Sequence, residues 1–291
     1  MLITVAVVPG PPALVAELMG SAAAELDELR DAADRAVSVA LRELIAVSAR
    51  SPSPGSGAGS GAGPGPVSGS PFGQLVVVGP GEPGEYNAAG PVSFAGFGRD
   101  VVVPALVEGE PHDGELPTPI MVARYLASRD LAAHPEHAQL WASARWITTC
   151  GADATALGEK LGADAAGICL ILVADGAACH GPKAPRAQDA RAQGYDDGVC
   201  AALASGQPSR LAQLDADLGE ALGANGTQVW PVFVAATGTR AQPGGGHHPH
   251  GTEDSDGAGA AADQDWIGEV LWAGAPYGVG WAVASWRRSC R

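Results

Sequence analysis

Runs of consecutive apolar residues predict the buried strands of a mostly parallel sheet. The first run, Leu2 to Val8, is apolar at nearly every position and rich in β-branched residues, which is typical of a strand covered on both faces. Two later runs, Leu75 to Val78 and Gly167 to Ala174, have the same character. Further strands are expected at Val101 to Val103, Ile267 to Trp272 and Val279 to Ala284.

Amphipathic periodicity predicts helices between these strands. From Leu14 to Leu44, apolar residues recur at steps of three and four, the spacing of one face of a helix that is broken at most once. Other helices are expected at Thr118 to Ser128, Asp153 to Leu161, Tyr195 to Ala204 and Ser209 to Leu222. Alternating strands and helices predict the α/β class, a three-layer sandwich around a central, mostly parallel sheet. The last two strands are expected to form an antiparallel edge.

Two low-complexity segments interrupt this pattern. Residues 51–70 are almost entirely Gly, Ser, Pro and Ala, and residues 242–263 are similarly rich in Gly and polar residues. Such compositions offer too little apolar surface to offset the entropy of ordering. We therefore expect a single domain over residues 1–291, with disordered insertions at 51–70 and 242–263.

Composition and charge narrow the classes of partner. The 291 residues carry 17 basic and 32 acidic side chains, a formal charge of −15, which repels nucleic-acid phosphates and anionic lipids. No apolar run approaches the ~20 residues of a membrane span, and the start lacks a basic signal region. We expect a cytoplasmic protein that binds neither nucleic acid nor membrane. Its cysteines are scattered, without a C-x-x-C pair, so we expect free thiols rather than a metal or redox site.

One glycine pattern resembles a dinucleotide-binding fingerprint. Residues 79–84 fit G-x-G-x-x-G directly after a predicted strand. However, Pro80 and Pro83 have no backbone N–H to offer a phosphate, and Glu82 repels one. We do not expect a dinucleotide site here.

Four segments in order carry a family resemblance. They are Val7 to Val15, Val76 to Gly81, Ala174 to Asp196, and Ala275 to Trp281. On these segments the chain resembles the LigB-type class III extradiol ring-cleavage dioxygenase-like proteins. The resemblance spans nearly the whole chain outside the two insertions, and the last segment is the most specific.

The resemblance implies an ancestral non-haem Fe(II) site of two histidines and one glutamate, with open positions for a catecholic substrate and O₂. By position in the motifs, the two histidines would fall at Gly10 and Gly81, and an acid/base histidine would fall near Ala178. Glycine has no side-chain donor atom. We therefore expect no cofactor, and Fe(II) only if the family activity is retained. The glutamate ligand is not identified, with Glu82 and Glu269 both open.

His180 and Asp175 are the candidate catalytic pair. Both follow the predicted strand that ends at Ala174, and a histidine beside a carboxylate can act as a general acid or base. Gly10, Gly81, Glu82 and Tyr277 are the other candidate pocket residues. The alternatives are a solvent-facing His180, an Asp175 that caps the turn after its strand, and a Tyr277 that packs the last strand onto the sheet.

Other histidines have ligand-like spacing. His134 and His137 stand three residues apart, but Pro135 between them argues against a regular helical turn. We expect both to be surface residues that flank a helix. His247, His248 and His250 form a histidine-rich tract that can scavenge metal without forming a catalytic site.

Three hypotheses of function follow. The first is a LigB-like domain without the iron site, a pseudoenzyme that binds a small molecule or a protein. The second is an active enzyme, either a ring-opening dioxygenase or a hydrolase, with a site rearranged around His180. The third is a structural or assembly protein whose closing hairpin forms a homo-oligomer contact.

Overall fold

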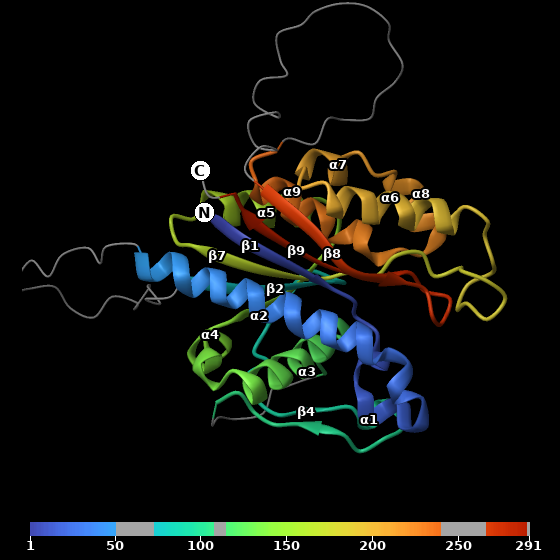
Figure 1. The fold of residues 1–291 in the computed structure, drawn as a ribbon, viewed down its shortest axis with the longest axis horizontal. Helices are drawn as coiled ribbons and strands as arrows, with labels where there is room; N and C mark the ends of the chain where they lie inside the picture. The colour runs from blue at the N-terminus through green and yellow to red at the C-terminus, as the bar shows by residue number, and fades with distance from the viewer. Residues whose placement is uncertain (51–72, 108–114, 240–265, 290–291) are drawn as a thin grey trace, which may run out of the picture.

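The computed structural model describes residues 1–50, 73–107, 115–239 and 266–289 (Figure 1). The expected insertions at 51–70 and 242–263, and the histidine-rich tract, lie outside the described residues. Within the described residues, no helix is long and apolar enough to cross a bilayer. Cys150, Cys169, Cys179 and Cys200 are free, as expected.

Seven strands form one central sheet in the order β3-β6-β2-β7-β1-β9-β8. The neighbouring pairs among β6, β2, β7 and β1 are parallel, whereas β3 and the β8–β9 hairpin pair antiparallel at the two edges. The predicted α/β class and the antiparallel edge at the end of the chain are confirmed. The strands are β1 (Leu2–Val8), β2 (Gln74–Pro80), β3 (Gly84–Tyr86), β6 (Arg145–Thr149), β7 (Ile168–Val173), β8 (Trp266–Gly274) and β9 (Trp281–Arg288). A separate ribbon pairs β4 (Val92–Ser93) with β5 (Val102–Val103).

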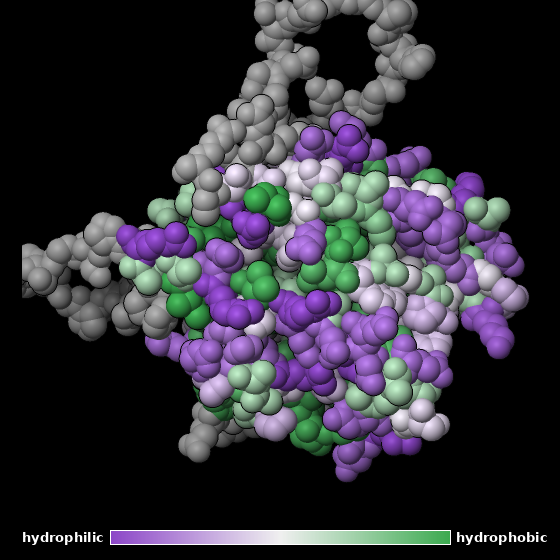
Figure 2. All heavy atoms as spheres, in the orientation of Figure 1, coloured by the Kyte–Doolittle hydropathy of each residue, from purple (hydrophilic) through white to green (hydrophobic). Residues whose placement is uncertain are grey.

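Helices cover both faces of the sheet (Figure 1). One face carries α2 (Asp27–Arg50), α3 (Thr118–Ala133) and α4 (Ala138–Ala142). The other carries α5 (Gly151–Ala163), α6 (Ala192–Ala204), α7 (Pro208–Ala212), α8 (Ala216–Leu222) and α9 (Trp230–Ala236). Figure 2 shows mostly hydrophilic residues, with scattered hydrophobic ones, on the face that α2 and β8 present.

The helix expected from Leu14 to Leu44 is divided. A short α1 (Ala16–Met19) ends at Gly20, and a 3-10 segment (Gly20–Leu26) follows before α2 begins. Gly20 has a φ of 57°, a left-handed conformation that glycine adopts readily and that ends a right-handed helix.

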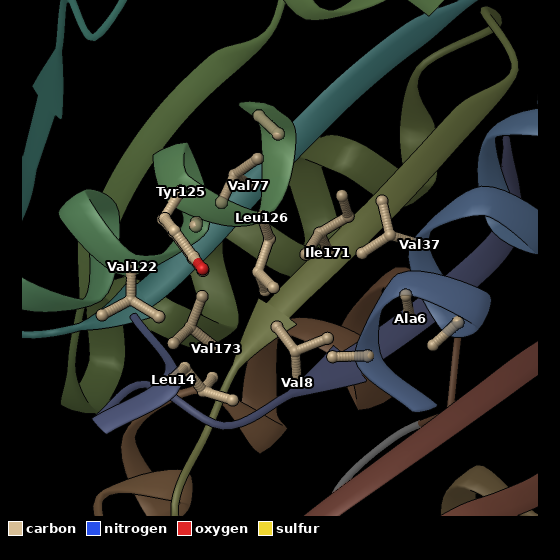
Figure 3. Close-up of a cluster of buried hydrophobic side chains, with 14 of the residues drawn as sticks. Ala6, Val8, Leu14, Val37, Val77, Val122, Tyr125, Leu126, Ile171 and Val173 are labelled. Atoms are coloured by element: carbon tan, nitrogen blue, oxygen red, sulfur yellow. The ribbon is translucent and has the colours of Figure 1, made fainter. Parts of the chain in front are cut away.

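The core lies in two layers, one on each side of the sheet. Side chains alternate along the central strands, so that Ala6, Val8, Ile171 and Val173 join the layer under α2 and α3 (Figure 3). Full burial of a valine or isoleucine side chain contributes about 1.5–3 kcal/mol to the free energy of unfolding. The buried apolar side chains of the central strands therefore anchor the sheet. Their parallel register brings the carboxyl ends of β1, β2, β6 and β7 to one edge, where ligand sites of α/β folds lie.

Candidate functional site

Asp175 ties the end of β7 to two other segments. Its Oδ1 accepts a hydrogen bond from the backbone N–H of Gly10 at 2.9 Å, and its Oδ2 accepts one from Asn225 Nδ2 at 2.9 Å. The Asp175 backbone N–H donates to Asn225 Oδ1 at 2.7 Å. Desolvation raises the pKa of Asp175, and the hydrogen bonds from Gly10 and Asn225 oppose that rise. Both carboxylate oxygens are thus committed to holding the strand end, a role close to the capping alternative.

His180 pairs with Asp196 rather than with Asp175. His180 Nε2 lies 2.6 Å from Asp196 Oδ2, and the two side chains are only 12% and 14% exposed. The backbone N–H of Ala177 donates to Asp196 Oδ1 at 3.0 Å, and the His180 N–H donates to the Gly278 carbonyl at 3.0 Å. Desolvation raises the pKa of Asp196, opposed by its bonds to Ala177 and His180. The Asp196 carboxylate is therefore held by the Ala177 backbone and by the His180 ring, and the His180 backbone is held by the Gly278 carbonyl.

Glycines make room for the Asp196 carboxylate. A Cβ added at Gly280 would lie 1.7 Å from Asp196 Oδ2, and one added at Gly176 would lie 2.4 Å from Oδ1. The two backbones are themselves joined, since the Gly176 N–H donates to the Gly280 carbonyl at 2.7 Å. Only residues without a side chain allow this close approach.

A cavity of about 190 Å³ opens beside the pair. Asp175, His180 and Asp196 line it together, and Asp197 adds a further carboxylate. Its walls are otherwise mostly apolar or small, and no Lys or Arg is among its described lining residues. The cavity lies between the end of β7, helix α6 and the β8–β9 hairpin, with these further lining residues: Val7, Ala174, Gly176, Gln193, Val199, Cys200, Trp230, Ala273, Gly274, Ala275, Gly280, Trp281 and Ala282.

The corner at Gly10 is packed. A Cβ added at Gly10 would lie 2.7 Å from Val173 Cγ1 and 3.9 Å from Pro119 Cβ. Pro119 also fills the space beside Gly79, where an added Cβ would lie 2.7 Å from Pro119 Cβ. An imidazole at Gly10 would have to displace Val173, which is buried.

The other expected pocket residues lie away from this cavity wall. Gly81 has a φ of +145° and faces Thr148, whose hydroxyl donates to the Glu82 carbonyl at 2.5 Å. The Glu82 side chain is exposed. The Tyr277 hydroxyl donates to Glu25 Oε2 at 2.8 Å. Of the six candidate site residues, the structure therefore places only Asp175 and His180 on the wall of this cavity.

Tyr277 lies in the turn between β8 and β9, and Glu269 lies on β8. The Tyr277 ring meets Trp281 edge-on, with 6.0 Å between centroids, and packs against the core layer under α2. That position matches the alternative in which Tyr277 packs the last strand onto the sheet. Glu269 is exposed on the edge strand β8. In the part of the chain that the structure describes, no group of three or more His, Cys, Asp and Glu side chains could hold a metal ion.

His137 was expected on the surface, and this prediction is wrong. It is fully buried, with Nδ1 2.9 Å from Asp130 Oδ2. Trp141 Nε1 donates to the same oxygen at 2.8 Å. The chain turns at Pro135 in a short 3-10 helix (Pro135–His137), which directs His137 inward against α3. His134 stays partly exposed beside Glu136.

Sequence reasoning missed Asp196 as the partner of His180. Sixteen residues separate them, and Asp196 lies in a helix whose carboxylates resemble an ordinary solvated face. The nearby glycines, Gly176 and Gly280, were the available signal, because each removes a side chain at the same carboxylate.

The chemical capacity of the cavity depends on the His180 imidazole. A carboxylate on one ring nitrogen fixes the orientation of the ring. No described residue hydrogen-bonds the other nitrogen, Nδ1, so it can exchange a proton or a hydrogen bond with a ligand. Models of known protein families give no match to this chain, and neither do the curated proteins.

Proposed function

We propose that this chain is a LigB-like α/β protein without the family's iron site, which binds a small neutral or cationic organic molecule beside His180 and Asp196. The observation that carries the proposal is the His180–Asp196 pair, 2.6 Å apart on the wall of a cavity at the carboxyl edge of the sheet. Ligand sites of α/β proteins lie at this edge. The motif resemblance and the mostly parallel sheet support a class III extradiol dioxygenase-like architecture.

The residues at the strand corners do not fit an Fe(II) centre. Glycine stands at both positions where the motifs would supply histidine, Gly10 and Gly81. At Gly10, Val173 occupies the space that a side chain would need. A site of two histidines and one carboxylate that loses both imidazoles keeps at most one ligand. We therefore assign no step of chemistry to iron.

The charges around the cavity select the ligand. Asp175, Asp196 and Asp197 line it, and the His180 imidazole is paired with Asp196. Because no Lys or Arg is among the described lining residues, an anionic ligand would lose its hydration shell without gaining a cation from them in exchange. The apolar walls, which include Trp230 and Val199, suit a compact aromatic or aliphatic body. Engineered cavities of ~150 Å³ hold a benzene ring, so a cavity of about 190 Å³ suits a ring with one polar group.

Three probes with the same ring and different charges test this proposal. Benzylamine, benzyl alcohol and benzoate are titrated into the ¹⁵N-labelled protein at pH 7.5, with the shifts of the Trp230 indole and the His180 backbone amide followed by NMR. Saturable shifts are expected from the amine or the alcohol and not from benzoate. His180→Ala should weaken the binding, and His134→Ala, at a partly exposed site elsewhere, should not. Tighter binding of benzoate, or binding unchanged in His180→Ala, would refute the proposal.

Acid–base catalysis in the same cavity is a second candidate. It is favoured by the Asp196–imidazole hydrogen bond and by the Nδ1 of His180, which no described residue hydrogen-bonds; this is the arrangement of a general base. The simplest reaction is ester hydrolysis, in which the base removes a proton from an attacking water. Turnover of p-nitrophenyl acetate should then fall at least 100-fold in His180→Ala. Hydrolysis equal in the two proteins would exclude it.

A further inference from the structure

The carboxylates that line the cavity beside His180 differ in how far the protein itself uses them. Both oxygens of Asp175 and both oxygens of Asp196 are hydrogen-bonded to described residues. Asp197 accepts one such bond, on Oδ1, from Gln193 Nε2 at 2.8 Å. No described residue donates to Asp197 Oδ2, and the Asp197 residue is exposed while it lines the cavity. The charge of Asp197 is therefore available to a ligand.

The Asp197 carboxylate also orients the amide of Gln193. An ionised carboxylate only accepts hydrogen bonds, so the NH₂ group of Gln193 faces Asp197 Oδ1 and the amide oxygen Oε1 is left over. No described residue donates to that oxygen. The two residues stand four apart on α6, which places them on one face of the helix, and both line the cavity. This end of the cavity therefore presents oxygens that accept hydrogen bonds, one of them on a charged group.

His180 adds an acceptor to the same cavity. Its Nε2 lies 2.6 Å from the Asp196 carboxylate, so Nε2 carries the proton of the neutral ring and Nδ1 is the acceptor. No Lys or Arg is among the described lining residues to occupy these acceptors. An alcohol offers them one O–H, whereas a primary ammonium group offers three N–H donors and a positive charge. The acceptors of the cavity thus suit an ammonium group better than an alcohol.

We propose that Asp197 selects the charge of the ligand, so that the cavity prefers a primary amine, in its ammonium form, to a neutral molecule of the same shape. This inference rests on the function proposed above and narrows its ligand class to small organic amines. The ammonium group pairs with Asp197 at the exposed end of the cavity, where it keeps part of its hydration and avoids the full cost of burying a charge. The apolar body contacts Val199 and Trp230.

Benzylamine and benzyl alcohol test this preference, because they have the same ring and nearly the same shape. An alkyl ammonium group, like that of lysine, is protonated at pH 7.5. Each compound is titrated into ¹⁵N-labelled protein, and the Kd is taken from the backbone amide shifts of His180 and Gly274, which line this cavity. Benzylamine should bind about 3- to 10-fold more tightly. Raising NaCl from about 20 mM to about 500 mM should remove most of this difference, since salt screens exposed charges.

Two variants that each remove one negative charge assign the preference to a residue. Asp197→Asn keeps the shape of the side chain and an oxygen for Gln193, so it should fold normally. It should weaken benzylamine binding to the level of benzyl alcohol and leave the alcohol unchanged. Asp31→Asn is the matched control, because Asp31 is exposed on α2, on the opposite face of the sheet. It should leave the preference for benzylamine intact.

The outcomes separate this inference from the function on which it rests. Equal Kd values for the two compounds in the wild type, or a preference for benzylamine that persists in Asp197→Asn, would overturn the role of Asp197 while the binding cavity stands. Loss of the preference in Asp31→Asn as well would assign it to net charge and would also overturn that role. Absence of saturable binding of both compounds would overturn the proposed function and this inference together.

Discussion

Replacement of Gly280 by alanine should disconnect His180 from Asp196. The new Cβ would lie 1.7 Å from Asp196 Oδ2, whereas real Cβ atoms stay at least 3.0 Å from such neighbours. The Gly280 backbone cannot withdraw easily. Its N–H donates to the Ala177 carbonyl at 2.8 Å, and its carbonyl accepts from Gly176 at 2.7 Å. The carboxylate must therefore retreat by about 1.3 Å, which breaks its 2.6 Å contact with His180 Nε2.

Two free-energy losses set how much Gly280→Ala destabilises the protein. Loss of a hydrogen bond to a charged group costs about 1.5–3 kcal/mol, and overpacking of a tightly filled site costs about 1–3 kcal/mol. The two overlap, because moving the carboxylate relieves part of the clash. We expect the free energy of unfolding to fall by about 2–5 kcal/mol.

Urea unfolding followed by circular dichroism measures this loss. Gly194→Ala is the matched control: it lies on α6, the helix of Asp196, and a Cβ added there meets no described atom within 4 Å. Alanine in a helix is more stable than glycine by about 0.5–1 kcal/mol, so this control should stabilise the protein. A loss below about 0.5 kcal/mol in Gly280→Ala would refute the packing described for Asp196.

Two other predictions concern buried carboxylates. Asp130→Ala removes the acceptor shared by His137 and Trp141 and should cost about 3–5 kcal/mol by urea unfolding. Asp34→Ala, whose ion pair with Arg129 is about 30% exposed on both sides, should cost at most about 1 kcal/mol; similar losses in the two variants would contradict this contrast. The pKa of Asp175 is raised in the folded protein, so the folded state binds the Asp175 proton more tightly than the unfolded chain does. The contribution of Asp175 to the free energy of unfolding is therefore greatest below pH 4 and declines as the pH rises through the raised pKa. The stability of the wild type relative to Asp175→Asn should therefore fall between pH 4 and pH 7, and a difference that stays constant or grows would show that the sign is wrong.

The central strands were predictable because burial on both faces leaves a direct trace in the sequence. Leu2–Val8 contains apolar residues at nearly every position, and the structure places it at the predicted bounds. The helix after it was less predictable. The apolar spacing continues through Gly20, and only the left-handed φ of that residue reveals the break.

The site was harder to predict, because its contacts join distant parts of the chain. His180 and Asp175 were found from their place after β7, but the Asp196 partner comes from a helix whose spacing says nothing about tertiary contacts. His137 was misplaced for a similar reason. Pro135 weakens a helical turn, yet the 3-10 turn that replaces it directs the imidazole into the core.

The iron content of the purified protein is the most direct test of whether this chain holds an Fe(II) centre. An untagged variant with His247, His248 and His250 replaced by alanine excludes adventitious binding by that tract. After anaerobic incubation with excess Fe(II) and gel filtration, atomic emission should find far less than one iron per chain. One tightly held Fe(II) per chain would show that the protein has an iron site after all, although glycines at positions 10 and 81 have no side chain with which to hold the metal.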